Sequence, residues 1–249
     1  MAIAIVSNSQ SSAWKGKKCA VVLTYDDALN VHLDNVIPAL DSVGLKGTFY
    51  LSVSYPGCSN RIADWRRAAL KGHELANHTM FHPCISNRPG REWVSPDQAL
   101  EKYTMTRLLN EIKMTNTFLQ AIDGKTKRTF AYPCGDMTVG DSSYVDKIKS
   151  EFTAARGVKR EMSTVKSIDY YDVGAFAING ETGRQLIAIV QDAIKENSLV
   201  VFLFHGVGGE HGLNVDRHAH KLLLNFLKDN EKEIWTTTFL DVTEHMKAQ

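Results

Sequence analysis

Two adjacent carboxylates end an apolar run near the start of the chain. Residues 21–25 read Val-Val-Leu-Thr-Tyr, and Asp26 and Asp27 follow directly. In an extended strand successive side chains point to opposite faces, and burying an unpaired carboxylate costs free energy. Two interpretations follow: the strand ends at Tyr25 and both acids reach solvent in a loop, or a bound metal ion offsets their charge.

Two histidines offer further ligands for such an ion. His78 and His82 are four residues apart, which brings both imidazoles to one side of a helical turn or of a compact loop. With Asp27 they make a set of two imidazoles and one carboxylate, which binds zinc or a similar divalent ion and leaves a position open for water. Because the chain has nine histidines, an incidental pair is the alternative.

Asp26 and His205 complete the groups that hydrolysis of an acetamide or an acetate ester requires. A metal ion lowers the pKa of its water toward about 7 and polarises the carbonyl, and Asp26, beside the ligand Asp27, is placed to take the proton of that water. His205 follows the apolar run 199–204, where its imidazole can protonate the leaving group. The alternative for His205 is a strand-end histidine hydrogen-bonded to backbone.

These residues need a scaffold that gathers them, and the chain predicts a parallel α/β fold. With 249 residues, of which 43% are hydrophobic, it is long enough for a single large core. Eight short apolar runs alternate with helical patterns, which is typical of a parallel sheet covered on both faces. The predicted strands are 20–24, 47–52, 73–77, 128–132, 152–156, 172–178, 199–204 and 234–239. They predict one (β/α) barrel of TIM type with seven or eight parallel strands, spanning 19–249 after an N-terminal extension, 1–18.

In such a barrel the chemistry lies at the carboxyl ends of the strands. Asp26 and Asp27 follow the first predicted strand, and His78 and His82 follow the third. His205 follows the seventh. The candidate residues thus fall at the same end of several strands, which favours a shared site.

Three helical patterns are clear between the predicted strands. Residues 108–122 carry apolar side chains at helical spacing and are closed by Gly124, and the segments 184–197 and 222–227 repeat the pattern. Pro38 interrupts an earlier helical pattern, so that helix either begins near Ile37 or kinks there.

Charge and hydropathy argue against several partners. A formal net charge of +1 gives no electrostatic reason to expect nucleic acid or an anionic membrane. No apolar run approaches the roughly 18 residues of a spanning helix. Residues 1–10 carry a short apolar patch without a basic segment, so they make a poor signal peptide.

The cysteines allow two expectations. Cys19, Cys58, Cys84 and Cys134 form no C-x-x-C pair, which argues against a structural zinc cluster. A chain of this size does not need disulfides, so four free thiols are one expectation. The other is a Cys58–Cys84 bridge between loops that border the same mouth.

Five segments resemble, in order, the motifs of the polysaccharide deacetylase family, the NodB-type carbohydrate esterases. They are LTYDD, KGTFYLS, GHELANHTMFH, FAYPCG and VVFLFHG. The resemblance implies a distorted (β/α) barrel that holds a divalent metal ion and removes acetyl groups from sugars. It assigns Asp26 as general base, Asp27, His78 and His82 as metal ligands, His205 as general acid, and the backbone N–H of Cys134 as a contact to the oxyanion.

Two features of the family pattern are missing. Many members have an arginine at the position of Ala131, where it orients the base carboxylate. Arg128 lies three residues early, and Arg156, at the end of the next predicted strand, is better placed. We therefore expect Arg156 within hydrogen-bonding reach of Asp26. The family's acid-and-tryptophan fourth motif is also absent, so the pocket for the acetyl methyl group stays unassigned.

Several further residues have open roles. Trp93 is either a sugar platform or part of a lid that packs on itself, whereas Trp65 lies in a helical pattern and is expected to pack. His211, His218 and His220 follow the seventh predicted strand, and we expect them to cap or decorate the next helix.

The sequence predicts metal-dependent hydrolytic removal of acetyl groups from carbohydrate, with N-acetylglucosamine-containing poly- or oligosaccharides favoured as substrates. Acetyl-xylan esterase activity is the alternative within the same chemistry, and a catalytically silent sugar-binding barrel is the alternative of another class. One divalent ion is expected, with zinc favoured over cobalt, nickel or manganese. The family resemblance favours a secreted or periplasmic location, with a cytoplasmic one left open. A monomer without nucleic-acid or membrane partners is favoured.

Overall fold

The computed structural model describes residues 13–249, so the apolar patch of residues 1–10 lies outside the described residues. The segment just before the first strand packs on the rest of the chain, since Trp14 is fully buried against residues of the barrel interior. None of the helices within 13–249 is long and apolar enough to cross a membrane.

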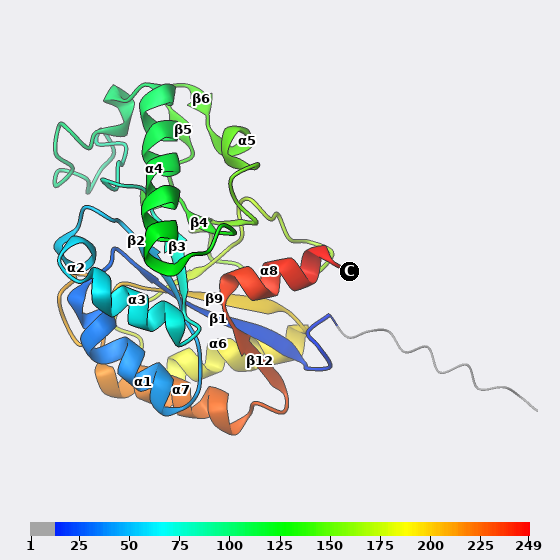
Figure 1. The fold of residues 1–249 in the computed structure, drawn as a ribbon. Coiled ribbons are helices and arrows are strands. Elements are labelled where there is room, and N and C mark those ends of the chain that lie inside the picture. Colours follow the sequence, from blue (N-terminus) through cyan, green and yellow to red (C-terminus); the bar gives the residue numbers. More distant parts are fainter. Residues whose placement is uncertain (1–12) are drawn as a thin grey trace, which may run out of the picture.

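Eight parallel strands form the central sheet (Figure 1). They are β1 (Cys19–Asp26), β2 (Thr48–Leu51), β3 (Glu74–Asn77), β4 (Phe130–Ala131), β7 (Ala155–Arg156), β8 (Phe176–Ala177), β9 (Leu199–Phe204) and β12 (Ile234–Thr237). The order is β7-β4-β3-β2-β1-β9-β8, with β12 paired to the first half of β1. Each strand lies at one of the eight predicted positions, and the predicted barrel class is confirmed.

The sheet is curved, so that its two edge strands, β7 and β8, lie close to each other. An isolated parallel bridge between Arg156 and Val173 joins β7 to the segment that leads into β8. The strands at this edge are only two residues long, which is shorter than the predicted runs 152–156 and 172–178. The result is a distorted barrel with a loosely paired seam rather than a regular closed one.

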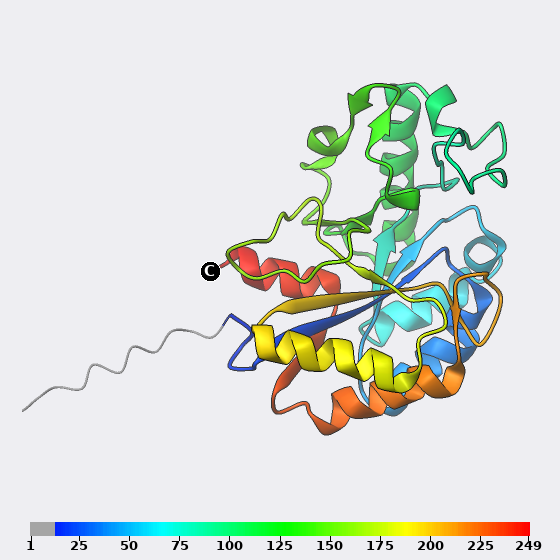
Figure 2. The same ribbon diagram turned by 180° about the vertical axis from the view of Figure 1, so that it is seen from behind.

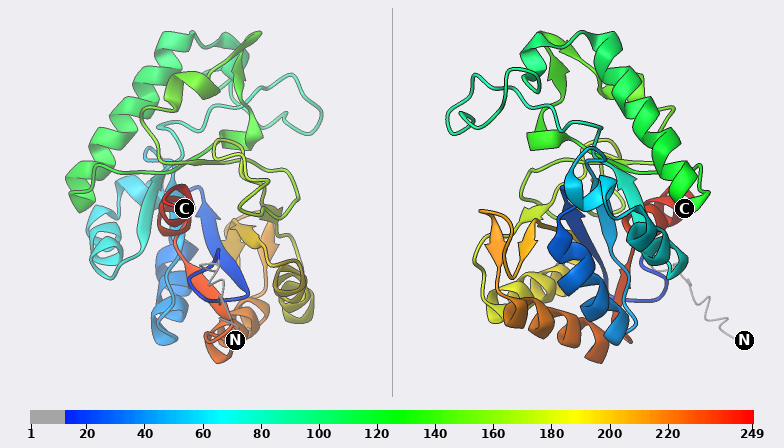
Figure 3. Two further views of the ribbon diagram at one scale, coloured as in Figure 1. Left: turned by 90° about the vertical axis from the view of Figure 1, so that its right-hand side faces the viewer. Right: turned by 60° about the vertical axis from the view of Figure 1, so that its left-hand side comes forward.

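Helices cover the outside of the sheet. They are a π-helical turn (His32–Val36), α1 (Ile37–Ser42), α2 (Pro56–Ser59), α3 (Ile62–Leu70), α4 (Met105–Asp123), α5 (Val145–Ile148), α6 (Gly183–Glu196) and α7 (Arg217–Asp229). The last helix, α8 (Phe239–Lys247), instead packs through Phe239, Val242 and Met246 against the interior face of the sheet. Helices α1, α7 and α6 lie side by side on one side of the barrel (Figure 2). The segment from α4 through the hairpin β5 (Thr138–Val139) and β6 (Ser142–Ser143) to α5 stands above the other side (Figure 3).

Helix boundaries follow local capping. The side-chain oxygen of Thr104 accepts a hydrogen bond from the N–H of Arg107 at the start of α4, and Gly124 closes this helix with φ 72°, a conformation that glycine adopts without strain. Helix α6 begins with a reciprocal capping box between Thr182 and Gln185. Pro38 lies at the start of α1, which follows directly on the π-helical turn His32–Val36. The regular hydrogen-bond pattern of the helix is thus interrupted next to the residue that lacks an N–H.

Alternation along the strands separates two apolar layers. In β1, Cys19, Val21, Leu23 and Tyr25 pack against the outer helices, whereas Ala20 and Val22 face the barrel interior, as the period of two requires. The interior layer also contains Ala76, Ala131 and Ala154. Small interior side chains leave room for larger groups at the mouth of the barrel.

Candidate active site

The predicted site residues continue the interior-facing positions of four strands. The interior-facing residues are Ala20 and Val22 in β1, Ala76 in β3, Ala154 directly before β7, and Leu199, Val201 and Leu203 in β9. Two residues beyond Ala76, Ala154 and Leu203 come His78, Arg156 and His205. Asp26, at the end of β1, lies an even number of positions after Ala20 and Val22 and so belongs to the same face of the strand. Because parallel strands end at the same rim, the four side chains meet there.

Asp27 and the two predicted imidazoles have the geometry of a metal site. Asp27 Oδ1 lies 3.5 Å from His78 Nε2 and 3.3 Å from His82 Nε2. Bonds of about 2.0–2.1 Å to a tetrahedral ion place ligand atoms about 3.3 Å apart. Asp27 Oδ1 is buried and has no hydrogen-bond partner among residues 13–249. A buried carboxylate oxygen without a donor fits a cation, so these three residues suit the divalent ion that the sequence predicts.

The imidazoles of His78 and His82 are held in the neutral form. His78 Nδ1 donates a hydrogen bond of 2.8 Å to the carbonyl oxygen of Ala131, which leaves Nε2 free to coordinate. Burial lowers the pKa of both His78 and His82 to about 4 because it disfavours the charged form. Neither ring is therefore protonated at neutral pH.

The backbone is contorted where it presents these ligands. Asp27, Thr79 and His82 have φ values of 80°, 65° and 53°, a region that costs non-glycine residues about 1–3 kcal/mol each. The N–H of Thr79 donates to Asn77 Oδ1 and the N–H of His82 donates to Thr79 Oγ1. His78 and His82 thus meet across a compact loop, one of the two predicted possibilities.

Arg156 contacts Asp26, as predicted. It donates a short hydrogen bond from Nη2 to Asp26 Oδ2 and another, of 3.0 Å, from Nη1 to the Gly157 carbonyl. Its guanidinium lies 5.1 Å from the ring centroid of Tyr50, a favourable cation–π arrangement. Arg128, the other arginine considered, instead forms a buried ion pair with Asp123.

The ion pair decides the charge of Asp26. Burial raises the pKa of this carboxyl, but the positive charge of Arg156 and its hydrogen bond outweigh burial and leave the pKa below its usual value. Asp26 is consequently ionised at neutral pH. Its Oδ1 atom has no hydrogen-bond partner among the described residues and remains able to accept a proton.

His205 faces the other carboxylate oxygen of Asp27 from the one that His78 and His82 face. Its Nε2 is 3.8 Å from Asp27 Oδ2. The carbonyl oxygen of His205 accepts a hydrogen bond of 2.8 Å from His32 Nε2, which anchors the backbone at this point. Burial lowers the pKa of His205 to about 4.

One histidine of the site was assigned wrongly from the sequence. His211, expected to cap or decorate a helix, lies in the loop between β10 (Gly206–Val207) and β11 (Asn214–Val215). Its ring stacks on that of His205, with centroids 4.5 Å apart and planes 12° apart. The glycine-rich run Gly-Val-Gly-Gly after His205 was the available signal, since such a run lets a loop fold back on itself.

The neighbouring histidines differ from each other. His218 is exposed on α7, as expected. His220 is buried and hydrogen-bonded to the Tyr25 hydroxyl at 2.8 Å, so it packs inside rather than decorating a surface.

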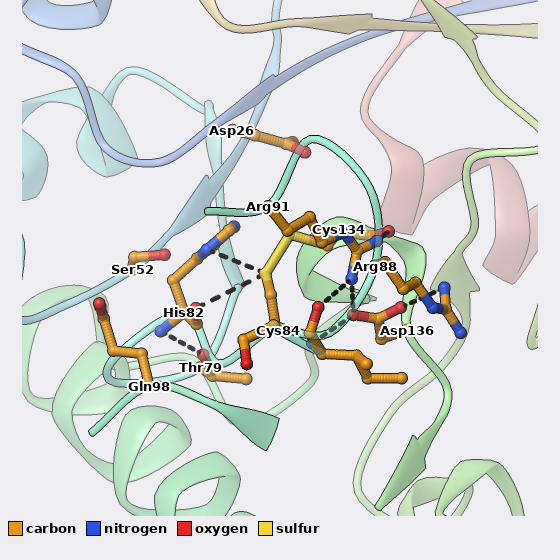
Figure 4. Close-up of a disulfide and its surroundings, with 12 residues drawn as sticks. Asp26, Ser52, Thr79, His82, Cys84, Arg88, Arg91, Gln98, Cys134 and Asp136 are labelled. Atoms are coloured by element: carbon orange, nitrogen blue, oxygen red, sulfur yellow. Dashed lines mark hydrogen bonds and ion pairs between the residues drawn. A yellow bond between two sulfur atoms is a disulfide. The ribbon is translucent and has the colours of Figure 1, made fainter. Parts of the chain in front are cut away.

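A disulfide joins Cys84 to Cys134 beside His82 (Figure 4). Both cysteine expectations were therefore wrong: the thiols are not all free, and Cys58 is a buried free cysteine in α2. Strands β3 and β4 are neighbours, so the loops that follow them meet, whereas Cys58 is turned into the helical layer. Cys84 Sγ lies 3.6 Å from His82 Nδ1.

The same disulfide fixes the predicted oxyanion residue. Cys134 has φ 55° in the turn after β4, and its carbonyl accepts a hydrogen bond from Arg91. Arg91 and Arg88 also form ion pairs with the buried Asp136 (Figure 4). The loop after His82 is thereby tied to the turn after β4 at several points.

A cavity of about 740 Å³ opens above these groups. Its walls include Tyr55, Trp93, Tyr132, Val158, Leu203 and Leu213, and its floor includes Asp26, Asp27, His78, His82 and His205. Trp93 is 58% exposed, and its ring lies 6.2 Å from that of His82. Trp65 is fully buried, in agreement with the predicted packing role. Polar groups converge beneath an apolar wall, the usual form of a small-molecule site.

Two known sequences resemble parts of the chain. A chitooligosaccharide deacetylase from Sinorhizobium fredii is 38% identical over 68 residues, which cover 27% of this chain and 31% of that protein. The uncharacterised protein YlxY of Bacillus subtilis is 25% identical over 141 residues, which cover 57% of this chain and 36% of that protein. The matches span about a third of the length of each relative.

Solved structures share the fold. The family 4 acetyl xylan esterase from Clostridium thermocellum, determined with a cobalt ion, has a TM-score of 0.56, 22% identity, and coverage of 90% of each chain. A mutant of BA3943, described as a pseudoenzyme of the CE4 family, has a TM-score of 0.54, 16% identity, and coverage of 92% of this chain and 68% of its own. At these identities the likeness concerns the fold alone.

The family assignment rests on sequence. Residues 14–150, more than half of the chain, match the polysaccharide deacetylase family. The chain belongs to the polysaccharide deacetylase family.

Proposed function

We propose that this protein removes acetyl groups from carbohydrate by metal-dependent hydrolysis, with N-acetylglucosamine-containing poly- or oligosaccharides as the favoured substrates. The observation that carries the proposal is the buried triad of Asp27, His78 and His82 beside an ionised Asp26. Two imidazoles and one carboxylate favour zinc, with cobalt, nickel or manganese as possible substitutes. A divalent ion held there activates water and polarises the acetyl carbonyl.

Asp26 is the general base in this proposal. Its free Oδ1 accepts the proton of the attacking water, while its Oδ2 stays paired with Arg156. The ion pair fixes the orientation of the carboxylate and keeps it ionised, so it is ready to accept a proton at neutral pH.

His205 delivers a proton to the leaving nitrogen or oxygen. Because its lowered pKa leaves the imidazole neutral at rest, it must first gain a proton, and the proton removed from water by Asp26 is the source. The backbone N–H of Cys134 donates to the developing oxyanion, and the disulfide with Cys84 holds that turn.

Amide and ester substrates use the same groups, so acetyl-xylan esterase activity is the second candidate. The family 4 acetyl xylan esterase shares the fold. A silent sugar-binding barrel is the candidate of another class, and the fold also occurs in a pseudoenzyme. The complete set of base, triad and acid in this chain favours catalysis over binding alone.

Metal analysis and acetate release from a panel of acetylated glycans test the proposal. Asp27→Ala is expected to lose the ion, whereas Asp26→Asn keeps the ion and loses kcat by roughly a hundredfold or more. Asp141→Asn, at an exposed position, is the matched control. No acetate release from any substrate by the metal-loaded protein would contradict the proposal, and glycan binding without turnover would favour the silent barrel.

A further inference from the structure

Asp27 faces two sets of imidazoles, one on each oxygen. Oδ1 lies within 3.5 Å of the Nε2 atoms of His78 and His82. Oδ2 lies 3.8 Å from Nε2 of His205 and 3.8 Å from Nε2 of His211. In each set, the three ligand atoms lie within 4.8 Å of one another. One carboxylate is therefore shared by two groups of nitrogen ligands.

We infer that Asp27, His205 and His211 form a second divalent-cation site, with Asp27 bridging two ions. Carboxylate-bridged pairs of ions about 3.5–4 Å apart are common in hydrolases. Two imidazoles and one carboxylate again match the ligands that zinc prefers. Both histidines line the cavity, so an ion from solvent reaches them.

The second site binds more weakly than the first. Its carboxylate–imidazole distances of 3.8 Å exceed the 3.3–3.5 Å of the first triad. The rings of His205 and His211 are stacked almost parallel, and they must tilt apart before both nitrogens point at one ion. A second divalent charge is also repelled by the first across the shared carboxylate. We expect an affinity at least about tenfold lower than that of the first site.

Occupation of this site would inhibit the enzyme. This consequence rests on the proposed function, in which His205 Nε2 protonates the leaving group. The same nitrogen faces Asp27 Oδ2, so an ion bound there removes it from proton transfer. Zinc that fills this site is then expected to lower acetate release roughly a hundredfold or more, since a general acid contributes at least about that factor.

Titration of the metal-free protein with Zn²⁺, followed by calorimetry and by metal analysis after dialysis, tests the inference. The wild type is expected to bind two equivalents, the second more weakly. His211→Ala is expected to lose the weak site alone, His78→Ala to lose the tight one, and His218→Ala, altered at an exposed histidine of α7, to match the wild type. Binding of one equivalent by the wild type, or of two by His211→Ala, would overturn the inference.

A second measurement separates this inference from the proposed function. The ratio of acetate release at excess Zn²⁺ to release at one equivalent is expected to fall in the wild type and in His218→Ala, but not in His211→Ala. Two bound ions without acetate release from any glycan would refute the proposed function and leave the second site standing. One bound ion with acetate release would refute the second site alone.

Discussion

Arg156 and Asp26 form a buried ion pair at the rim of the barrel, although they lie 130 positions apart in the chain. Arg156 is paired in register with Ala131 of the neighbouring strand. The arginine that the family pattern places at Ala131 is thus supplied one strand further along the sheet, at the same level of the barrel. From this position the guanidinium of Arg156 reaches the carboxylate of Asp26.

Replacing Arg156 with Met tests whether this arginine of β7 holds and charges the carboxylate of Asp26. The variant keeps the length of the side chain and removes its charge, so the pKa of Asp26 rises and its orientation loosens. We expect metal content to survive, kcat to fall about ten- to hundredfold, and the acidic limb of the kcat profile to move to higher pH. Arg160→Met, at an exposed position nearby, is the control. An acidic limb at the same pH as in the wild type would show that Arg156 does not set the pKa of the general base.

The Cys84–Cys134 disulfide is expected to contribute to stability. The two cysteines are 50 positions apart, and closing a loop of that length in the unfolded chain stabilises the folded state by about 4 kcal/mol on the chain-entropy estimate. Cys84→Ser should lower the free energy of urea unfolding by that order. Dithiothreitol should lower the stability of the wild type similarly and leave the variant unchanged, which controls for effects of serine itself. Equal stability of oxidised and reduced wild type would show that the bond contributes nothing.

Trp93 is expected to act as a platform for a sugar ring. Its indole is largely exposed at the wall of the cavity, near His82, and the disulfide and the Asp136 ion pairs hold its loop in place. We expect Trp93→Ala to raise KM roughly five- to thirtyfold, from a loss of about 1–2 kcal/mol of aromatic contact, with a small change in kcat. Trp93→Phe should restore part of the binding. Leu70→Ala, at a distant exposed residue, is the control, and an unchanged KM in Trp93→Ala would rule the platform out.

The strands and the convergence of Asp27, His78 and His82 were predictable because they depend on short-range pattern. Buried parallel strands read as continuous apolar runs, and their carboxyl ends mark the site. Arg156 followed from the same logic, since it ends a strand. The side-chain parity of β1, β3, β7 and β9 then places the candidate residues on the interior face.

The wrong predictions concern contacts between loops and between layers. The partner of Cys84 depends on how two loops fold toward each other, which no local pattern encodes. His211 lies against His205 because the glycine-rich loop after β9 folds back in an irregular conformation. His220, by contrast, left a signal: it precedes Leu223, Leu224 and Leu227 at the spacing of a buried helix face, and its position on that face predicts burial.

The buried His220 makes stability depend on pH. Burial lowers the pKa of this imidazole to about 3, whereas an unfolded chain titrates its histidines near 6.5. Between these values the unfolded state binds a proton that the folded state does not. The contribution of neutral His220 to the free energy of unfolding is therefore complete above about pH 6.5 and decreases as the pH drops toward 3. One such histidine contributes a slope of about 1.4 kcal/mol per pH unit, or about 2 kcal/mol lost by pH 5.

His220→Gln is therefore expected to unfold less steeply with acid than the wild type. Glutamine keeps a hydrogen-bonding group near the Tyr25 hydroxyl but does not titrate. A change in packing shifts the free energy of unfolding by a similar amount at every pH. Loss of the titrating imidazole instead changes how steeply the free energy of unfolding depends on pH. Urea unfolding at several values between pH 5 and 8 measures both, with His218→Gln as the exposed control. A slope for His220→Gln equal to that of the wild type would mean that His220 takes up its proton equally well in the folded chain.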